Sequence, residues 1–372
     1  MRVCTKGGIE PNMKMIESLV LDSKVVSERQ GYSQGRGIKM RNVYLSGCVI
    51  AVVASLAALT SANAAESGTA GQQGLPGSGA GGTTAGVPDP GIYMFDTFAT
   101  YQAKIVGPGA PNNPGGVASS AVSNLAGVGF LWVPGWTFLG ASYDAVLVNS
   151  VVNSDIGAPA NIDKAGLHNT FVVPAELSWK LGDSGFVVKA GLGIYAPDGT
   201  TSGANKNFSI GNPFWTFRPE FIISYLKDGW NLTAIFYEEF NTKNTITGYT
   251  SGNQIDFEFA ATKRIGNWTV GPVAYYIGQV TNDTSSAFYG NAINYNRSSS
   301  LAVGGLVGYD FGKASLTVWA FDQVTANASG GTPNFGVDRA TTLQGWQAFA
   351  RISYKIWSPE SSDDVKPGLY HK

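Results

Sequence analysis

The sequence has few of the residues on which metal sites, disulfides and most catalytic centres depend. Its 372 residues include two cysteines and two histidines, and both cysteines, Cys4 and Cys48, precede Ala65. Zinc sites and thiol chemistry need several such residues close together. A serine hydrolase needs a histidine beside its nucleophile, and His168 followed by Asn169 matches that arrangement poorly. We therefore expect no metal, no cofactor and no enzymatic activity.

Charge is also scarce, at 14% of the residues. From Ala65 onward the chain carries 17 lysines and arginines and 22 aspartates and glutamates. Because nucleic-acid-binding proteins present strongly basic surfaces, this slightly acidic chain is not expected to have nucleic acid as a partner.

No apolar run is long enough for a membrane-spanning helix, which needs about 20 residues. The longest run, 43–59, follows Met40-Arg41 and precedes Ala62-Asn63-Ala64. A charged start, a short apolar core and small residues before a cleavage point are typical of a secretory signal peptide. The sequence therefore predicts a signal peptide that is cleaved near Ala64.

What the sequence has in abundance is alternation of apolar and polar residues. From Phe214 to Tyr225 the odd positions are mostly apolar and the even positions mostly polar. This period of two predicts a strand with one apolar face. The pattern resumes after Asp228-Gly229 and continues to Phe240, which predicts a hairpin. Strands of about twelve residues, with aromatic residues near both ends of the apolar face, are typical of a transmembrane β-barrel.

About twelve such runs follow one another along the chain. They cover 91–106, 119–133, 136–151, 168–181, 184–195, 213–227, 230–243, 252–265, 268–281, 297–311, 314–325 and 342–357. Short turns alternate with long connections rich in Gly, Asn, Ser and Pro. Short periplasmic turns, long extracellular loops and an even strand number indicate an all-β antiparallel barrel of a bacterial outer membrane.

Dividing each strand into odd- and even-numbered positions, which we call its parity, separates a lipid face from a lumen face. A charge facing lipid costs roughly 2–4 kcal/mol at the bilayer midplane, so we assign most strand charges to the lumen. Apolar residues such as Phe171, Val173, Leu177 and Trp179 are assigned to the lipid face. The predicted pore-lining residues are Asp96, Phe98, Lys104, Phe138, Asp144, Glu176, Lys180, Lys189, Phe214, Arg218, Glu220, Tyr237, Glu239, Asp256, Glu258, Tyr275, Gln279, Asp310, Trp319, Phe321, Phe349 and Arg351.

Several local motifs carry a resemblance to a known family. They are Pro90-Gly91-Ile92-Tyr93, Tyr195-Ala196-Pro197-Asp198-Gly199, Trp215-Thr216-Phe217-Arg218-Pro219, Tyr249-Thr250-Ser251-Gly252-Asn253 and Trp268-Thr269-Val270-Gly271-Pro272. With these motifs the sequence resembles the phenol-degradation meta-pathway outer-membrane family over nearly the whole mature chain. The resemblance implies an outer-membrane barrel that imports aromatic or other hydrophobic compounds, and some relatives are linked to sphingoid-lipid uptake. The polar tail after Trp357 departs from the family, whose last strand commonly ends the protein.

The predicted organisation has five parts. Residues 1–39 are expected to be a non-native extension, 40–64 a signal peptide, 65–90 a flexible Gly/Ala-rich segment, 91–357 the barrel and 358–372 a polar tail. The segment 65–90 can either plug the lumen or serve as a periplasmic tether.

For function, we expect passive uptake of small hydrophobic or aromatic solutes by a monomer that contacts outer-membrane lipid and lipopolysaccharide. The alternatives are a channel for small polar solutes and a lipid-acting barrel enzyme.

Overall fold

The computed structural model describes residues 72–110, 117–159, 161–201, 209–291, 294–331 and 340–359. The expected extension, the signal peptide, the start of the 65–90 segment and most of the polar tail lie outside these residues. No helix within the described ranges is long and apolar enough to cross a membrane.

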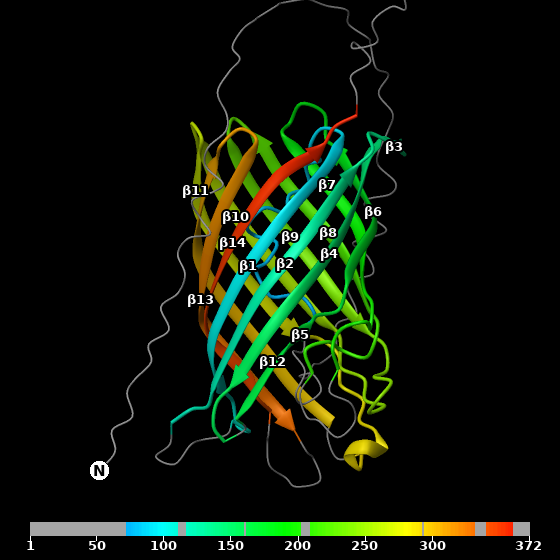
Figure 1. Cartoon of the computed structure of the whole chain (residues 1–372), viewed down its shortest axis with the longest axis vertical. Helices are drawn as coiled ribbons and strands as arrows, with labels where there is room; N and C mark the ends of the chain where they lie inside the picture. Colours follow the sequence, from blue (N-terminus) through cyan, green and yellow to red (C-terminus); the bar gives the residue numbers. More distant parts are fainter. Residues whose placement is uncertain are drawn as a thin grey trace, which may run out of the picture. The chain divides into compact units, whose positions relative to one another are not determined.

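Twelve long antiparallel strands form a closed barrel (Figure 1). They are β1 (Gly91–Val106), β2 (Ser120–Val133), β4 (Ala141–Ile156), β6 (Phe171–Lys180), β7 (Phe186–Tyr195), β8 (Thr216–Lys227), β9 (Trp230–Asn241), β10 (Gln254–Ile265), β11 (Trp268–Gln279), β12 (Asn294–Asp310), β13 (Ala314–Gly331) and β14 (Thr342–Trp357). Each strand pairs with its neighbours in sequence, and β1 closes the ring by pairing with β14. The predicted barrel of about twelve strands is confirmed.

Two shorter strands lie at the ends of this wall. β3 (Thr137–Phe138) pairs with the start of β4, and β5 (Ile162–Leu167) pairs with its far end. Short turns occupy the upper end of the barrel in Figure 1, whereas β5 and the 3-10 helix Ala287–Tyr289 lie at the lower end with the long loops. In outer-membrane barrels the short-turn end is periplasmic.

The hairpin of β8 and β9 shows how local sequence sets the register. Lys227 pairs with Trp230 across the turn, and the ladder continues to Thr216 opposite Asn241. Asp228 and Gly229 both have positive φ, 53° and 74°. This backbone matches the right-handed twist of the flanking strands and favours Asp-Gly, so the predicted hairpin forms as expected.

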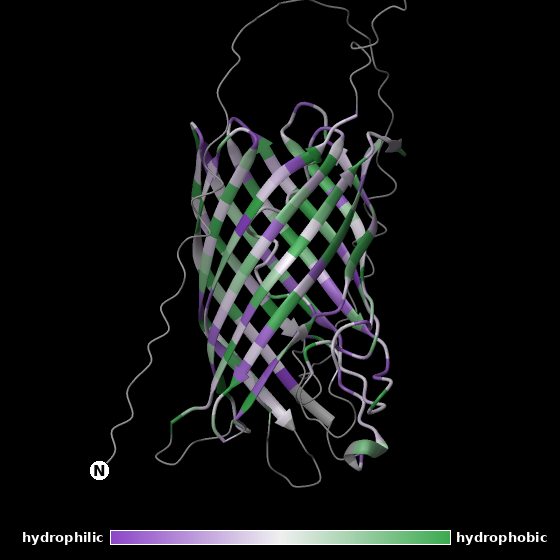
Figure 2. Cartoon of the chain, in the orientation of Figure 1, coloured by the Kyte–Doolittle hydropathy of each residue, from purple (hydrophilic) through white to green (hydrophobic). Residues whose placement is uncertain are grey.

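Hydropathy alternates along the strands, so each strand gives one face to the membrane and one to the lumen (Figure 2). Most predicted lumen residues are buried inside the wall: Asp144, Glu176, Lys189, Phe214, Arg218, Glu220, Tyr237, Glu239, Asp256, Glu258, Tyr275, Gln279, Trp319, Phe321 and Phe349. Arg351 is half-buried on the same side, and Lys180 and Asp310 lie at the short-turn mouth.

The lumen assignment of Asp96, Phe98 and Lys104 in β1 was wrong. Phe98 is 53% exposed on the outer wall, and Asp96 and Lys104 share its parity. The inner face of β1 instead carries Phe95, Thr97, Ala99, Tyr101 and Ala103. Ala99 packs in one cluster with Ala80. Lys104 lies toward a strand end, where the cost of facing lipid falls, but Asp96 lies nearer the middle of β1, so charge did not mark the inner face.

The assignment of Phe138 was also wrong, and the strand expected at 136–151 begins later, at Ala141, and continues to Ile156. Leu139 and Gly140 have positive φ and turn the chain ahead of β4. Phe138 therefore lies on the short-turn rim, 60% exposed, and does not reach the lumen.

A bulge in β6 overturns the predicted lipid-facing positions of Phe171 and Val173. The pairing register with β7 is irregular between Val172 and Glu176, a stretch that contains Pro174, which has no N–H to donate to the ladder. The extra residue reverses the alternation. Val173 is consequently buried, and the Phe171 ring lies 4.3 Å from the guanidinium of Arg218.

Candidate functional site

The lumen contains residues 72–90, which precede β1 and run inside the wall as the blue trace of Figure 1. Backbone N–H groups of this segment donate to carboxylates of the wall. Gln73 donates to Glu239 Oε2 at 2.8 Å, and Gly77 and Ala80 donate to the two oxygens of Glu258 at 3.0 and 2.6 Å. Hydrogen bonds with an ionised acceptor are roughly twice as strong as neutral ones, so these two glutamates are strong polar contacts of the segment.

The segment fits because it is rich in glycine. Gly77 has φ of 78°, and a Cβ built there would lie 2.5 Å from the ring of Phe321. A Cβ on Gly81 would lie 2.4 Å from the indole of Trp319. The backbone therefore lies directly against the aromatic side chains, at a distance that a larger residue would not allow.

These aromatic side chains come from β11, β13 and β14. The rings of Trp319 and Phe349 stack at 4.9 Å with an interplanar angle of 3°, and Tyr275 meets Phe321 edge-on at 5.0 Å. Trp319 Nε1 donates to Gly77 O at 2.9 Å. One side of the lumen is thus an aromatic wall, defined here as Tyr275, Trp319, Phe321 and Phe349, covered by residues 77–81.

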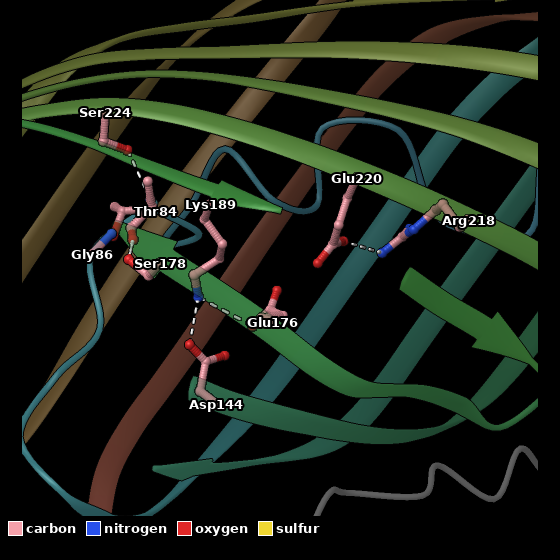
Figure 3. Close-up of polar contacts among 10 residues, drawn as sticks. Thr84, Gly86, Asp144, Glu176, Ser178, Lys189, Arg218, Glu220 and Ser224 are labelled. Carbon is pink, nitrogen blue, oxygen red and sulfur yellow. Dashed lines mark hydrogen bonds and ion pairs between the residues drawn. The ribbon is translucent and has the colours of Figure 1, made fainter. Parts of the chain in front are cut away.

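A second contact holds the segment nearer to β1. Ala85 N donates to Ser224 Oγ at 2.8 Å, and Ser178 Oγ donates to Ala85 O. Ala85 is fully buried against Val187 and Ile222. Figure 3 shows Ser178 and Ser224 beside Thr84 and Gly86.

The opposite side of the lumen is ionic (Figure 3). Lys189 Nζ lies 2.9 Å from Asp144 Oδ2 and 3.1 Å from Glu176 Oε2. Because all three groups are buried, each charge depends on the others for compensation. The triad joins β4, β6 and β7 across the inside of the wall.

Arg218 forms the second ionic group. Its guanidinium lies 4.3 Å from the Phe171 ring and 4.2 Å from the Tyr237 ring, and Nη1 donates to the hydroxyl of Tyr195 at 3.1 Å. Glu220 is 4.0 Å away. Aromatic faces attract a desolvated cation, so Arg218 is held in place chiefly by rings.

Carboxylates outnumber cations among the strand side chains inside the described wall. Six acids, Asp144, Glu176, Glu220, Glu239, Asp256 and Glu258, face three bases, Lys189, Arg218 and Arg351. Among the described residues, Asp256 Oδ1, Glu220 Oε1 and Arg218 Nε have no hydrogen-bond partner. Buried polar atoms without partners are uncommon in proteins, and here they leave the lumen with unused capacity to bind polar groups.

Three of the predicted site residues lie at the ends of the barrel. Asp310 pairs with Arg264 at 2.8 Å near the short turns, where both side chains are substantially exposed. Gln279 donates to Asp283 at 2.7 Å near the long loops. Lys180 is exposed at the end of β6. None of them is seen to contact residues 72–90 in the described structure.

The segment is also held from β14, by Gln347, which the sequence did not predict as a lumen residue, and by Arg351, which it did. Gln347 Nε2 donates to Pro76 O at 3.1 Å, and Arg351 donates both to Ser78 O and to Thr97 Oγ1. Gln347 shares the inward alternation of Phe349 and Arg351 in β14, which is the signal that could have found it. Thr97 faces inward because the predicted orientation of β1 was wrong.

His168 lies between β5 and β6, outside the membrane-spanning strands. Its ring meets Tyr195 edge-on at 6.1 Å, and burial lowers the pKa of the imidazole below its usual value. No serine hydroxyl of the described residues is hydrogen-bonded to this ring. The described chain also holds no group of three or more His, Cys, Asp or Glu side chains arranged to bind a metal ion.

Comparison with known proteins assigns the sequence to a family. The profile of the family described as the MetA-pathway of phenol degradation matches residues 104–343. The chain belongs to this family. The resemblance carried by the sequence motifs is thereby confirmed, and no curated protein matches the sequence.

One solved structure shares the fold of this family member, and two others are less similar. An outer membrane channel from Pseudomonas putida F1 has a TM-score of 0.59 at 10% identity, with 73% of this chain and 98% of that chain covered. The β domain of the Bordetella autotransporter BrkA reaches 0.38 at 13% identity, covering 72% of this chain and 100% of that one. A Pseudomonas aeruginosa FadL homologue also reaches 0.38, at 10% identity, covering 80% and 99%. The first likeness shows the fold, and the other two scores are too low to support a conclusion. The closed barrel is that of a bacterial outer-membrane protein.

Proposed function

We propose that this family member is a passive channel for small hydrophobic or aromatic compounds, and that residues 72–90 close it in the described state. One observation carries the proposal: the glycine backbone of residues 77–81 lies on the aromatic wall, where a flat solute could lie instead. Offset or edge contacts between aromatic rings contribute about 0.5–1.5 kcal/mol beyond simple burial.

Residues 72–90 have the composition of a displaceable closure. The segment carries no charged side chain before Asp89, and Leu75 and Val87 are its bulkiest apolar side chains. It is held mainly by hydrogen bonds to Glu239, Glu258, Asp256, Arg351 and a few neutral groups, each of which exchanges for a bond to water when the segment leaves. The net contribution of such bonds is about 0.5–3 kcal/mol each.

All the parts that the proposed channel needs belong to one chain. The wall, the closing segment and the ionic groups all come from the same barrel, so we propose that the monomer is the transporting unit. Its outer face would contact membrane lipid, with lipopolysaccharide at the long-loop end.

A second candidate, a channel for small polar cations, has one observation in its favour. Six carboxylates face three bases inside the wall, which favours cationic over anionic solutes. The lipid-acting enzyme has no comparable support, because the described structure places no serine hydroxyl on His168.

Deletion of residues 67–87 tests the proposal in planar bilayers. We expect the deletion to raise single-channel conductance clearly, and phenol-sized aromatic solutes to block the enlarged current in a concentration-dependent way. In the same background, Trp319→Ala should weaken this block about two- to tenfold, from the stacking energy above.

The outcome separates the candidates. A conductance that the deletion leaves unchanged would contradict closure by the segment. A raised conductance that organic amines block and aromatic solutes do not would favour the channel for polar cations.

A further inference from the structure

The outer wall of the barrel is hollowed across β7 to β12, where small residues lie between larger ones. A hollow of about 720 Å³ lies there, and its lining is almost entirely apolar, including Ala234, Phe259, Ala261 and Pro272. A Cβ on Gly305, the cross-strand partner of Pro272, would meet no atom within 4 Å.

Cross-strand pairing places a lysine side chain in line with the hollow. Ala234 pairs with Phe259, Leu232 with Ala261, and Trp230 with Lys263, in that order toward the short-turn end. Alternate residues on one face of a strand are about 7 Å apart. Lys263 therefore stands roughly 7 Å from the Ala261 position and about 14 Å from Phe259 along the same strand.

Lys263 has the surroundings of a headgroup contact. Its Nζ lies 4.8 Å from the centroid of the Trp230 ring and donates to Asp228 O at 2.6 Å. No carboxylate of the described residues forms an ion pair with it, so its charge is left for an anion. Trp and Lys beside each other are typical of the level of lipid headgroups.

We propose that the hollow binds one acyl chain of a periplasmic-leaflet phospholipid whose phosphate pairs with Lys263. The hollow is continuous with the lipid-facing wall, and the cation stands at its short-turn end, where the phosphate of that leaflet lies. Here the apolar hollow and the positive charge are in register, which distinguishes a site from general lipid contact.

Native mass spectrometry tests the site with the full-length mature barrel released from detergent micelles. The probes are dioleoyl phosphatidylglycerol and dioleoylglycerol, which shares the acyl chains but has no phosphate. Lys263→Gln should weaken retention of phosphatidylglycerol about tenfold, as expected for a hydrogen-bonded charge, and leave dioleoylglycerol unchanged. Ala261→Phe fills the hollow and should weaken retention of both lipids.

Matched controls place the same substitutions outside the hollow. Lys104→Gln and Ala126→Phe change outward residues of β1 and β2 and should leave both lipids bound as in the parent. A heat-modifiability gel verifies that each variant is folded. Equal losses with the control variants would overturn the proposal, as would retention of phosphatidylglycerol that Lys263→Gln does not change. Loss with Ala261→Phe alone would mean that the hollow binds apolar molecules without a headgroup.

Discussion

Replacing Glu258 by glutamine is expected to loosen the contact between the barrel wall and residues 72–90. Both carboxylate oxygens are engaged, with Gly77 N at 3.0 Å and Ala80 N at 2.6 Å. Glutamine keeps one acceptor and turns a donor toward the other N–H, so at least one charge-assisted bond is lost. Such a bond contributes about 1.5–3 kcal/mol. Since 1.4 kcal/mol is a factor of ten, the closed-to-open ratio should fall by roughly 10- to 100-fold.

The barrel itself should tolerate this change. Glu258 is fully buried, and Asp256 faces the same side of β10 two residues away. Removing one of two neighbouring buried carboxylates relieves desolvation and like-charge repulsion. Glu258→Gln should therefore raise the open probability without lowering the temperature at which the folded band disappears in a heat-modifiability gel.

Single-channel recording measures the effect, and Glu220→Gln is the matched control. Glu220 is also a buried carboxylate inside the wall, and in the described structure it makes no hydrogen bond to residues 72–90. An open probability that Glu258→Gln leaves at the parental value would refute the reasoning, and so would an equal increase in Glu220→Gln.

Two further predictions concern the wall. Ile223→Arg puts a charge on the lipid face and should cost roughly 2–4 kcal/mol of folding free energy. The folded yield in detergent should therefore fall, whereas Ile223→Leu should leave it unchanged. Equal yields of the two variants would show that Ile223 does not face lipid. In the barrel lacking residues 67–87, a salt gradient should give a reversal potential of cation selectivity, because carboxylates outnumber bases inside the wall; anion selectivity would mean that other groups control the pore.

Much of the fold was determined by local sequence. The alternation on either side of Asp228-Gly229 is a property of neighbouring residues, and it predicted β8 and β9 nearly to their ends. The length of the strands and the segregation of charge indicated a membrane barrel because lipid penalises exposed charge wherever a strand crosses. Acidic residues in the middle of strands, such as Glu220 and Glu258, were placed inside for the same reason.

Orientation could not be read so directly where the alternation was interrupted or weak. The bulge at Pro174 turned Phe171 and Val173 inward, although both are apolar. In β1, Phe98 faces out because the small inner residue Ala99 packs in one cluster with Ala80. Both outcomes depend on contacts with other parts of the barrel, which the period of a single strand does not contain.

The position of residues 72–90 was decided by tertiary structure alone. A run of Gly, Ala, Ser and Thr has no periodicity, so its composition suits a tether as well as a plug. Its partners are remote in sequence: Gly77 bonds to Glu258, 181 residues away, and Arg351 bonds to Ser78 O, 273 residues away. Only closure of the wall brings these acceptors, donors and aromatic rings around one space, and glycine allows the backbone to pass between them.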